Sequence, residues 1–112
     1  MIRLFLSVEI IVFLAAALMH FGIIVKGHEH DKARIAETII AVILFIGLLI
    51  SYIFPERTRK SAIIVQGLAL FGTFIGLFTI VVGIGPQSTP DYVFHTIMIF
   101  LLIAGLVVTK RS

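Results

Sequence analysis

Ionisable side chains that could do chemistry stand at a few positions inside long apolar runs of this sequence. Two of them are histidines, His20 and His95, and two are acids, Glu9 and Glu37. A charge inside a membrane is costly, so an ionisable group within such a run is by default a candidate functional site. Imidazole and carboxylate groups together can bind a metal, exchange a proton or hold the polar head of a ligand.

Three of the four histidines lie within "LMHFGIIVKGHEHDK". His20 lies at the end of the first apolar run, before the polar segment "KGHEHDK" that we expect to form a loop. We expect His20 to meet Glu37 and His95 in one ligand-binding site. Two histidines and a carboxylate can hold zinc, and two histidines on facing helices can ligate haem iron. In the loop, His28 and His30 form a second candidate metal site. The alternative is that these groups only hydrogen-bond helices to one another, so the cofactor is left open.

The composition places the chain in a membrane. Hydrophobic residues make up 60% of its 112 residues and charged residues 13%, and a soluble domain of this size could not bury that much apolar surface. Cysteine is absent, which excludes disulfides and cysteine-ligated metals. The net charge of +3 comes from basic residues at the ends of apolar segments, a pattern of membrane topology and not of nucleic-acid binding. The expected partners are the lipid bilayer and another membrane protein or further copies of this chain.

The apolar stretches are each close to the roughly 20 residues that a membrane-spanning helix needs. They predict one transmembrane domain over residues 1–112, an all-α, antiparallel four-helix bundle. The predicted helices cover residues 4–25, 35–54, 62–82 and 92–109. Gly27 is expected to end the first, Asp31 to cap or precede the second, and Thr89 to cap the fourth.

Lysine and arginine are distributed unequally between the two sides that this topology defines. Six of them lie at the termini and in the second loop, and three lie in the first and third loops. Cytoplasmic loops carry the excess of basic residues, so we expect both termini in the cytoplasm. Dual topology, with both orientations made, is the alternative.

A weak internal repeat divides the chain into two tandem helical hairpins. When the chain is shifted by 58 residues, "ETIIAVILFIGLLIS" from Glu37 meets "HTIMIFLLIAGLVVT" from His95, with five of fifteen positions identical. A shift of 57 pairs Glu9 with Gln66. Helical spacing also places these polar residues on inward stripes. Glu9 and Gln66 are therefore expected to meet in the half nearer the termini, where Glu9 is a candidate proton site.

The segment "AAALMHFG", followed by the acid-headed "IAETIIAVILFIGLLI", resembles the DoxX-like group of small four-helix membrane proteins, over about half the chain. The resemblance rests on His20, Phe21, Gly22 and Glu37, and it implies a membrane subunit of a quinone-linked oxidoreductase. The size and Glu9 also resemble small multidrug-resistance transporters. No catalytic triad or nucleotide-binding fingerprint is present. Three functions follow: a non-catalytic ligand- or partner-binding bundle, which we favour, a proton-coupled or dual-topology transporter, and a quinone- or haem-linked subunit.

Overall fold

The computed structural model describes residues 1–23, 27, 30–85 and 87–112. These residues form four α-helices and one 3-10 helix, with the bounds α1 (Ile2–Phe21), α2 (Asp31–Ile53), η1 (Pro55–Arg57), α3 (Thr58–Val81) and α4 (Thr89–Arg111). All four α-helices are long and apolar enough to cross a membrane. The predicted all-helical class with four membrane-length helices is therefore confirmed.

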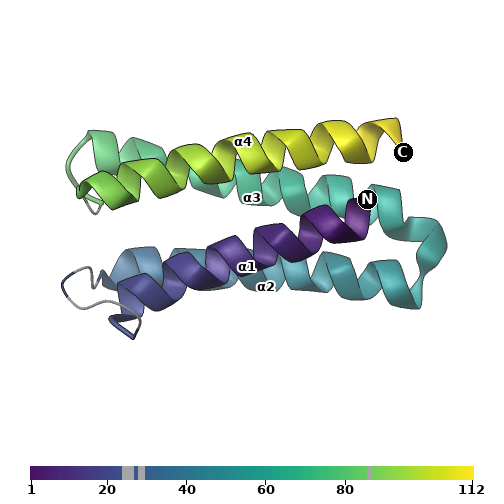
Figure 1. Cartoon of the computed structure of the whole chain (residues 1–112), viewed down its shortest axis with the longest axis horizontal. Helices are drawn as coiled ribbons and strands as arrows, with labels where there is room; N and C mark the ends of the chain where they lie inside the picture. The colour runs from purple at the N-terminus through teal and green to yellow at the C-terminus, as the bar shows by residue number, and fades with distance from the viewer. Residues whose placement is uncertain (24–26, 28–29, 86) are drawn as a thin grey trace.

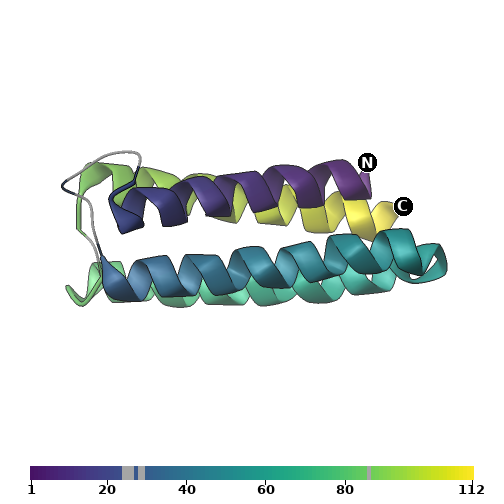
Figure 2. The ribbon, with the colours of Figure 1, turned by 90° about the horizontal axis from the view of Figure 1, so that it is seen from below.

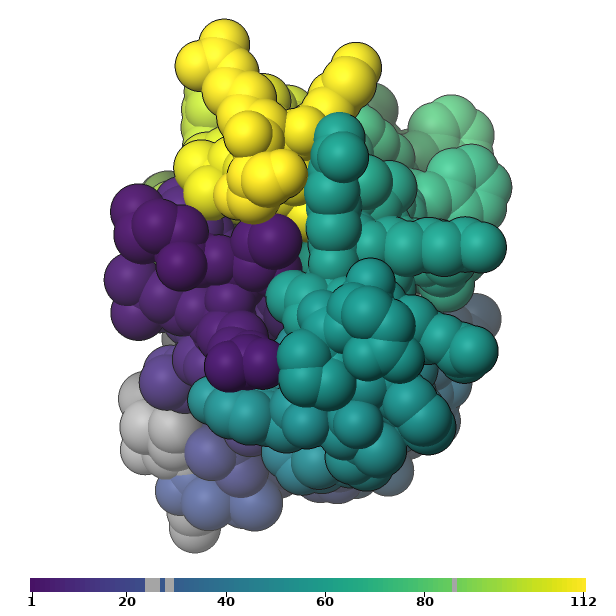
Figure 3. All heavy atoms as spheres, turned by 90° about the vertical axis from the view of Figure 1, so that its right-hand side faces the viewer, coloured from purple at the N-terminus to yellow at the C-terminus, as the bar shows by residue number. Residues whose placement is uncertain are grey.

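The four helices lie side by side along the long axis of the molecule (Figure 1). Helices α1 and α3 both contact α2 and α4, and α1 also contacts α3 to a smaller extent (Figure 2). Both termini and the connection through η1 lie at one end, which we call the terminal end (Figure 3). The opposite end, where α1 connects to α2 and α3 connects to α4, is called the loop end.

The helices begin earlier than their apolar stretches predict. Helix α2 starts at Asp31 and not at residue 35, α3 at Thr58 and not at 62, and α4 at Thr89 and not at 92. An apolar run marks only the part of a helix that lies in the hydrocarbon core of the membrane. The first turn is often polar, because its free N–H groups favour oxygen acceptors.

The residues that end and cap the helices also differ from the prediction. Helix α1 ends at Phe21, because Gly22 takes the left-handed conformation with φ 76°. Gly27 also has a positive φ but lies beyond that end. His30, not Asp31, caps α2, since its side chain accepts a hydrogen bond from the Ala33 N–H. The predicted end of the first helix, at residues 24–25, lies outside the described residues.

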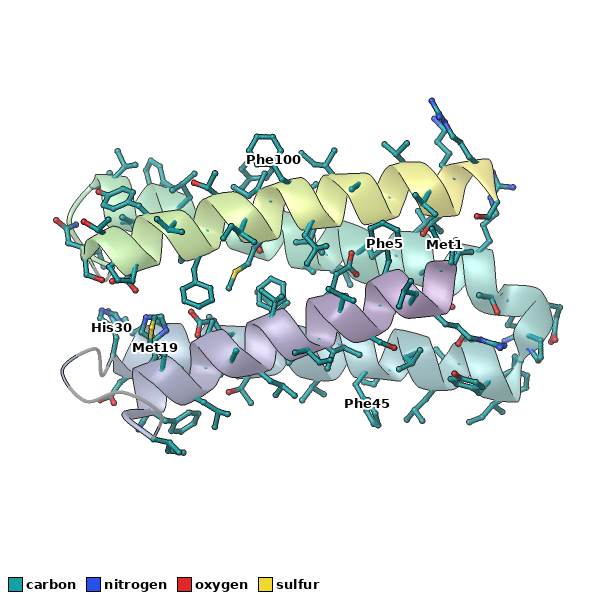
Figure 4. The ribbon with its side chains drawn as sticks, viewed as in Figure 1. Met1, Phe5, Met19, His30, Phe45 and Phe100 are labelled. Carbon is teal, nitrogen blue, oxygen red and sulfur yellow. The ribbon has the colours of Figure 1, made fainter. Side chains whose placement is uncertain are left out.

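The predicted inward stripes are buried. On α1 the buried stripe consists of Glu9, Phe13, Ala16 and His20, and on α2 of Glu37, Leu44 and Ser51. On α3 it consists of Gln66 and Thr73, and on α4 of His95, Leu102 and Thr109. Large apolar side chains instead cover the outside, as expected for a surface in contact with lipid. Phe45 on α2 and Phe100 on α4 point away from the other helices (Figure 4) and are 48% and 69% exposed.

The buried faces of α2 and α4 repeat at the spacing found in the sequence. With a shift of 58 residues, the buried positions that correspond are Glu37 and His95, Ile40 and Met98, Leu44 and Leu102, Gly47 and Gly105, and Ser51 and Thr109. Both glycines allow close packing. A Cβ on Gly47 would collide with Val65 of α3, and one on Gly105 would collide with Glu9 of α1 and Gln66 of α3.

Candidate functional site

A buried histidine connects three helices near the loop end. His20, near the end of α1, lies between the carboxylates of Glu37 on α2 and Asp91 on α4. Its Nδ1 is 2.8 Å from Glu37 Oε2, and its Nε2 is 2.7 Å from Asp91 Oδ1. All three residues are at most 5% exposed. Both ring nitrogens therefore carry hydrogen bonds inside the protein, and we call this group the His20 cluster.

Local structure at the helix ends holds the His20 cluster in place. Ser88 caps α4, and Asp91 completes a capping box, because its Oδ2 accepts from both the backbone N–H and the hydroxyl of Ser88. The other oxygen of Asp91 is thereby directed to His20. The loop beyond α1 is tied to the same place, since the N–H of His30 donates to the His20 carbonyl. The predicted cap, Thr89, is instead the first residue of α4.

His95 lies beside the His20 cluster, but its ring is not hydrogen-bonded to the ring of His20. Its Nδ1 is 2.8 Å from the Asp91 carbonyl, which can only accept, so this nitrogen carries the proton. In a neutral imidazole the other nitrogen, Nε2, then has a free lone pair. No described residue donates to that nitrogen. His95 packs closely on α3, where a Cβ on Gly76 would stand 2.9 Å from Nε2.

A cavity of about 170 Å³ opens beside His95 and Glu37 in the half of the molecule nearer the loop end. All four helices contribute to its wall, which is mostly apolar. Its side chains include Phe13, Ile40, Ile75, Ile84 and Met98, and its polar residues are His30, Lys32, Glu37, Thr73, Thr79 and His95. Gly72 and Gly76 of α3 also line the cavity, and neither has a side chain to fill it. An apolar cavity of this order, about 150 Å³, is large enough for a benzene ring.

The predicted metal and haem ligands can be tested against this geometry. Both nitrogens of His20 face carboxylates at hydrogen-bond distance, so neither offers a lone pair to zinc or iron. Within the described part of the chain, no three His, Asp or Glu side chains are grouped to hold a metal ion. His30 uses Nδ1 as the cap of α2, and His28 lies outside the described residues. His95 Nε2 is the histidine nitrogen of this region that is left to bind a ligand.

A second polar layer lies nearer the terminal end. Glu9 and Gln66 are both fully buried and both stand against Gly105 of α4, where a Cβ would collide with an oxygen of each. The Gln66 amide donates to the Ala62 carbonyl and to Thr109 Oγ1. No described residue donates a hydrogen bond to either Glu9 oxygen or to Gln66 Oε1. The structure thus brings Glu9 and Gln66 together, as the 57-residue shift predicts.

Asp91 is the residue of the site that the sequence prediction missed. The sequence around it predicts only the start of the fourth helix, with Thr89 as the cap. Two signals in the sequence point to Asp91. "STPD" has the spacing of a capping box, which turns the acid back into the first helical turn. Asp91 also lies four residues before His95, and therefore on the same face of α4.

Four membrane-length helices around buried polar groups define a small multi-pass membrane protein. No family model, curated protein or solved structure matches it.

Proposed function

We propose that this protein is an antiparallel four-helix bundle of two tandem hairpins that binds a small molecule in the cavity beside His95 and Glu37. The bundle is non-catalytic and works with further copies of itself or with another membrane protein. Its ligand is mostly apolar, to match the cavity wall, and carries a hydrogen-bond donor. Such a ligand partitions into the membrane and is then selected by one or two polar contacts.

The observation that carries this proposal is the free lone pair of His95 Nε2. The contact of Nδ1 with the Asp91 carbonyl fixes the tautomer and the orientation of the ring. His95 is 8% exposed and lines the cavity. A ligand O–H or N–H in the cavity would supply a donor that none of the described residues gives to this nitrogen.

Two probes of equal shape test the proposal. Benzyl alcohol has an apolar ring and an O–H donor, whereas toluene has the ring alone. In neutral lipid nanodiscs, we expect benzyl alcohol to shift the ¹⁵N resonance of His95 Nε2 in a saturable way, and toluene not to shift it. His95→Phe keeps an aromatic ring without a nitrogen acceptor, and ligand-observed NMR should detect no saturable binding of benzyl alcohol to this variant.

A pair of glycine variants controls for effects on folding. Gly76→Ala places a methyl group 2.9 Å from His95 Nε2 and should block benzyl alcohol. Gly67→Ala lies on the same helix with nothing within 4 Å of the new Cβ, so it should bind as the wild type does. Equal binding of both probes, or equal binding by both glycine variants, contradicts the proposal.

A second function is favoured by a separate observation, the buried Glu9. Its two oxygens and Gln66 Oε1 are all acceptors, and a proton on Glu9 would allow the acid to donate to Gln66. Such a group suits a small proton-coupled transporter. With ethidium as the transported probe, proteoliposomes should release protons in exchange. Glu9→Gln should abolish that exchange and keep the helical content measured by circular dichroism, and unchanged exchange would remove this function.

The orientation and the relation to other proteins are also proposals. We place both termini in the cytoplasm because the terminal end carries most of the basic residues. Membership of the DoxX-like group and a quinone-linked role rest on the short resemblance around His20 and Glu37. A haem-linked role rests on His20 and His95 as histidines of two different helices. A Soret band in the absorption spectrum of the purified protein would support the haem-linked role.

A further inference from the structure

The charge of the His20 cluster follows from its hydrogen bonds. Each of the two short contacts, from His20 to Glu37 and from His20 to Asp91, needs one proton between its atoms. Two protons shared among one imidazole and two carboxylates leave one net negative charge. That result is the same whichever atom holds each proton. With these two protons, and no third on a free carboxylate oxygen, the buried cluster is an anion.

The two carboxylates of the cluster differ in how well they are stabilised. Asp91 accepts from His20 and from the N–H and hydroxyl of Ser88, and it stands in the first turn of α4, where the helix dipole favours an anion. Glu37 accepts from His20 alone. No described residue donates to its Oε1, although the residue is 5% exposed and lines the cavity. Among the described residues, the acid in the cavity wall therefore has an oxygen to which no group donates.

The other inner polar groups of the wall are also acceptors toward the cavity. Thr73 and Thr79 donate their hydroxyl protons to the backbone of their own helix, which leaves oxygen lone pairs. His95 Nε2 adds another acceptor. Among the described residues of the wall, the donors lie near the loop end. They are the exposed Lys32 and the Nε2–H of His30, whose Nδ1 accepts from Ala33. Among the described residues, the ion pair of Glu37 is with His20 and not with Lys32.

We propose that the cavity binds a small organic cation, in which an ammonium group donates to Glu37 and His95 and an apolar body fills the rest. An ammonium has three N–H donors and no acceptor, which matches a wall of acceptors. Its charge also offsets the net negative charge of the His20 cluster. The apolar body takes the place beside Phe13, Ile40 and Met98. This inference rests on the proposed ligand-binding function and specifies the ligand class.

Four probes of nearly equal size test the inference in nanodiscs of neutral phosphatidylcholine. They are benzylammonium, benzyl alcohol, toluene and benzoate, each titrated against the ¹⁵N signal of His95. Benzylammonium is expected to bind about tenfold more tightly than benzyl alcohol, since a charge-assisted hydrogen bond is about twice as strong as a neutral one. Toluene and benzoate should not bind saturably.

Variants then assign the charge preference to a residue. Glu37→Gln keeps an oxygen acceptor for His20 and removes the charge, so benzylammonium should lose its advantage over benzyl alcohol. Lys32→Gln removes a positive charge from the same cavity wall and should make benzylammonium bind more tightly.

The outcomes separate this inference from the function on which it rests. Equal or tighter binding of benzyl alcohol, or a preference for benzoate, overturns the cation and leaves the ligand-binding function standing. A benzylammonium preference that survives Glu37→Gln, or weaker binding in Lys32→Gln, overturns the assignment to Glu37. If none of the four probes shifts the His95 signal, the ligand-binding function falls as well.

Discussion

At the scale of single residues, His20 does two things at once. Its ring connects α1 to α2 and to α4, and it gives a hydrogen-bond partner to Glu37 Oε2 and to Asp91 Oδ1, both buried. Removing one partner of a buried ion pair lowers stability more than replacing both partners by apolar residues, because the remaining charge stays uncompensated. The stability of the loop end should therefore depend strongly on this ring.

His20→Leu should lower the free energy of unfolding by about 3–5 kcal/mol, because Glu37 and Asp91 lose the group between them. The measurement is unfolding in a mixed detergent series followed by circular dichroism. Phe21→Leu is the matched control, since Phe21 is the next residue along the chain and is 43% exposed. A His20→Leu protein as stable as this control would contradict the role of His20 as a buried link.

Residue-scale predictions from the sequence succeeded where spacing alone decides burial. The stripe containing Glu9 and His20 and the pairing of Glu9 with Gln66 needed only helical periodicity and the repeat. Asp91 was missed because hydropathy marks it as a polar residue outside the apolar run. Its burial depends on the Ser88 cap and on the rotamer that the cap selects, which are properties of the folded helix end.

At the scale of elements, the helix ends were the hardest part to predict. Gly22 and Gly27 both have left-handed conformations, and the sequence does not say which of the two ends α1. At the start of α4, Ser88 and Thr89 are both good caps, and the choice depends on Asp91 returning the hydrogen bond. Apolar length predicts that a helix exists, whereas local hydrogen bonds set where it begins.

Ser88→Ala removes the cap of α4 and a donor to Asp91. We expect it to lower stability by about 1 kcal/mol, and somewhat more if Asp91 shifts away from His20. Thr89→Ala is the control, because Thr89 is exposed in the first turn and is not the cap. Thermal unfolding in detergent should rank the proteins as wild type, Thr89→Ala and Ser88→Ala. The reverse order would contradict the capping box.

At the scale of the whole molecule, the charges at the two ends differ. Arg3 donates to the side chain and carbonyl of Ser51, and Arg59 donates to the Lys110 carbonyl, so part of the basic charge at the terminal end is tied to the protein. Both termini lie at that end (Figure 1). The sequence predicted the helix number and class, because lipid permits few other arrangements.

Topology follows from this unequal charge. A reporter fused to the C-terminus should be active only in the cytoplasm, as the excess of Lys and Arg at the terminal end requires. Replacing Arg57, Arg59 and Lys60 together by Gln removes half of that charge, so part of the population should invert. Equal labelling of the wild type from both sides would indicate dual topology, and a reporter found only outside would contradict the proposed orientation.

The three-residue helix η1 joins the α1–α2 pair to the α3–α4 pair. So short a connection makes their association intramolecular, with an effective concentration in the millimolar range. The contacts between the two pairs then need only modest affinity to keep them together. A buried acid such as Glu9 is therefore compatible with a stable protein, because its contact with Gln66 need not hold the two pairs together alone.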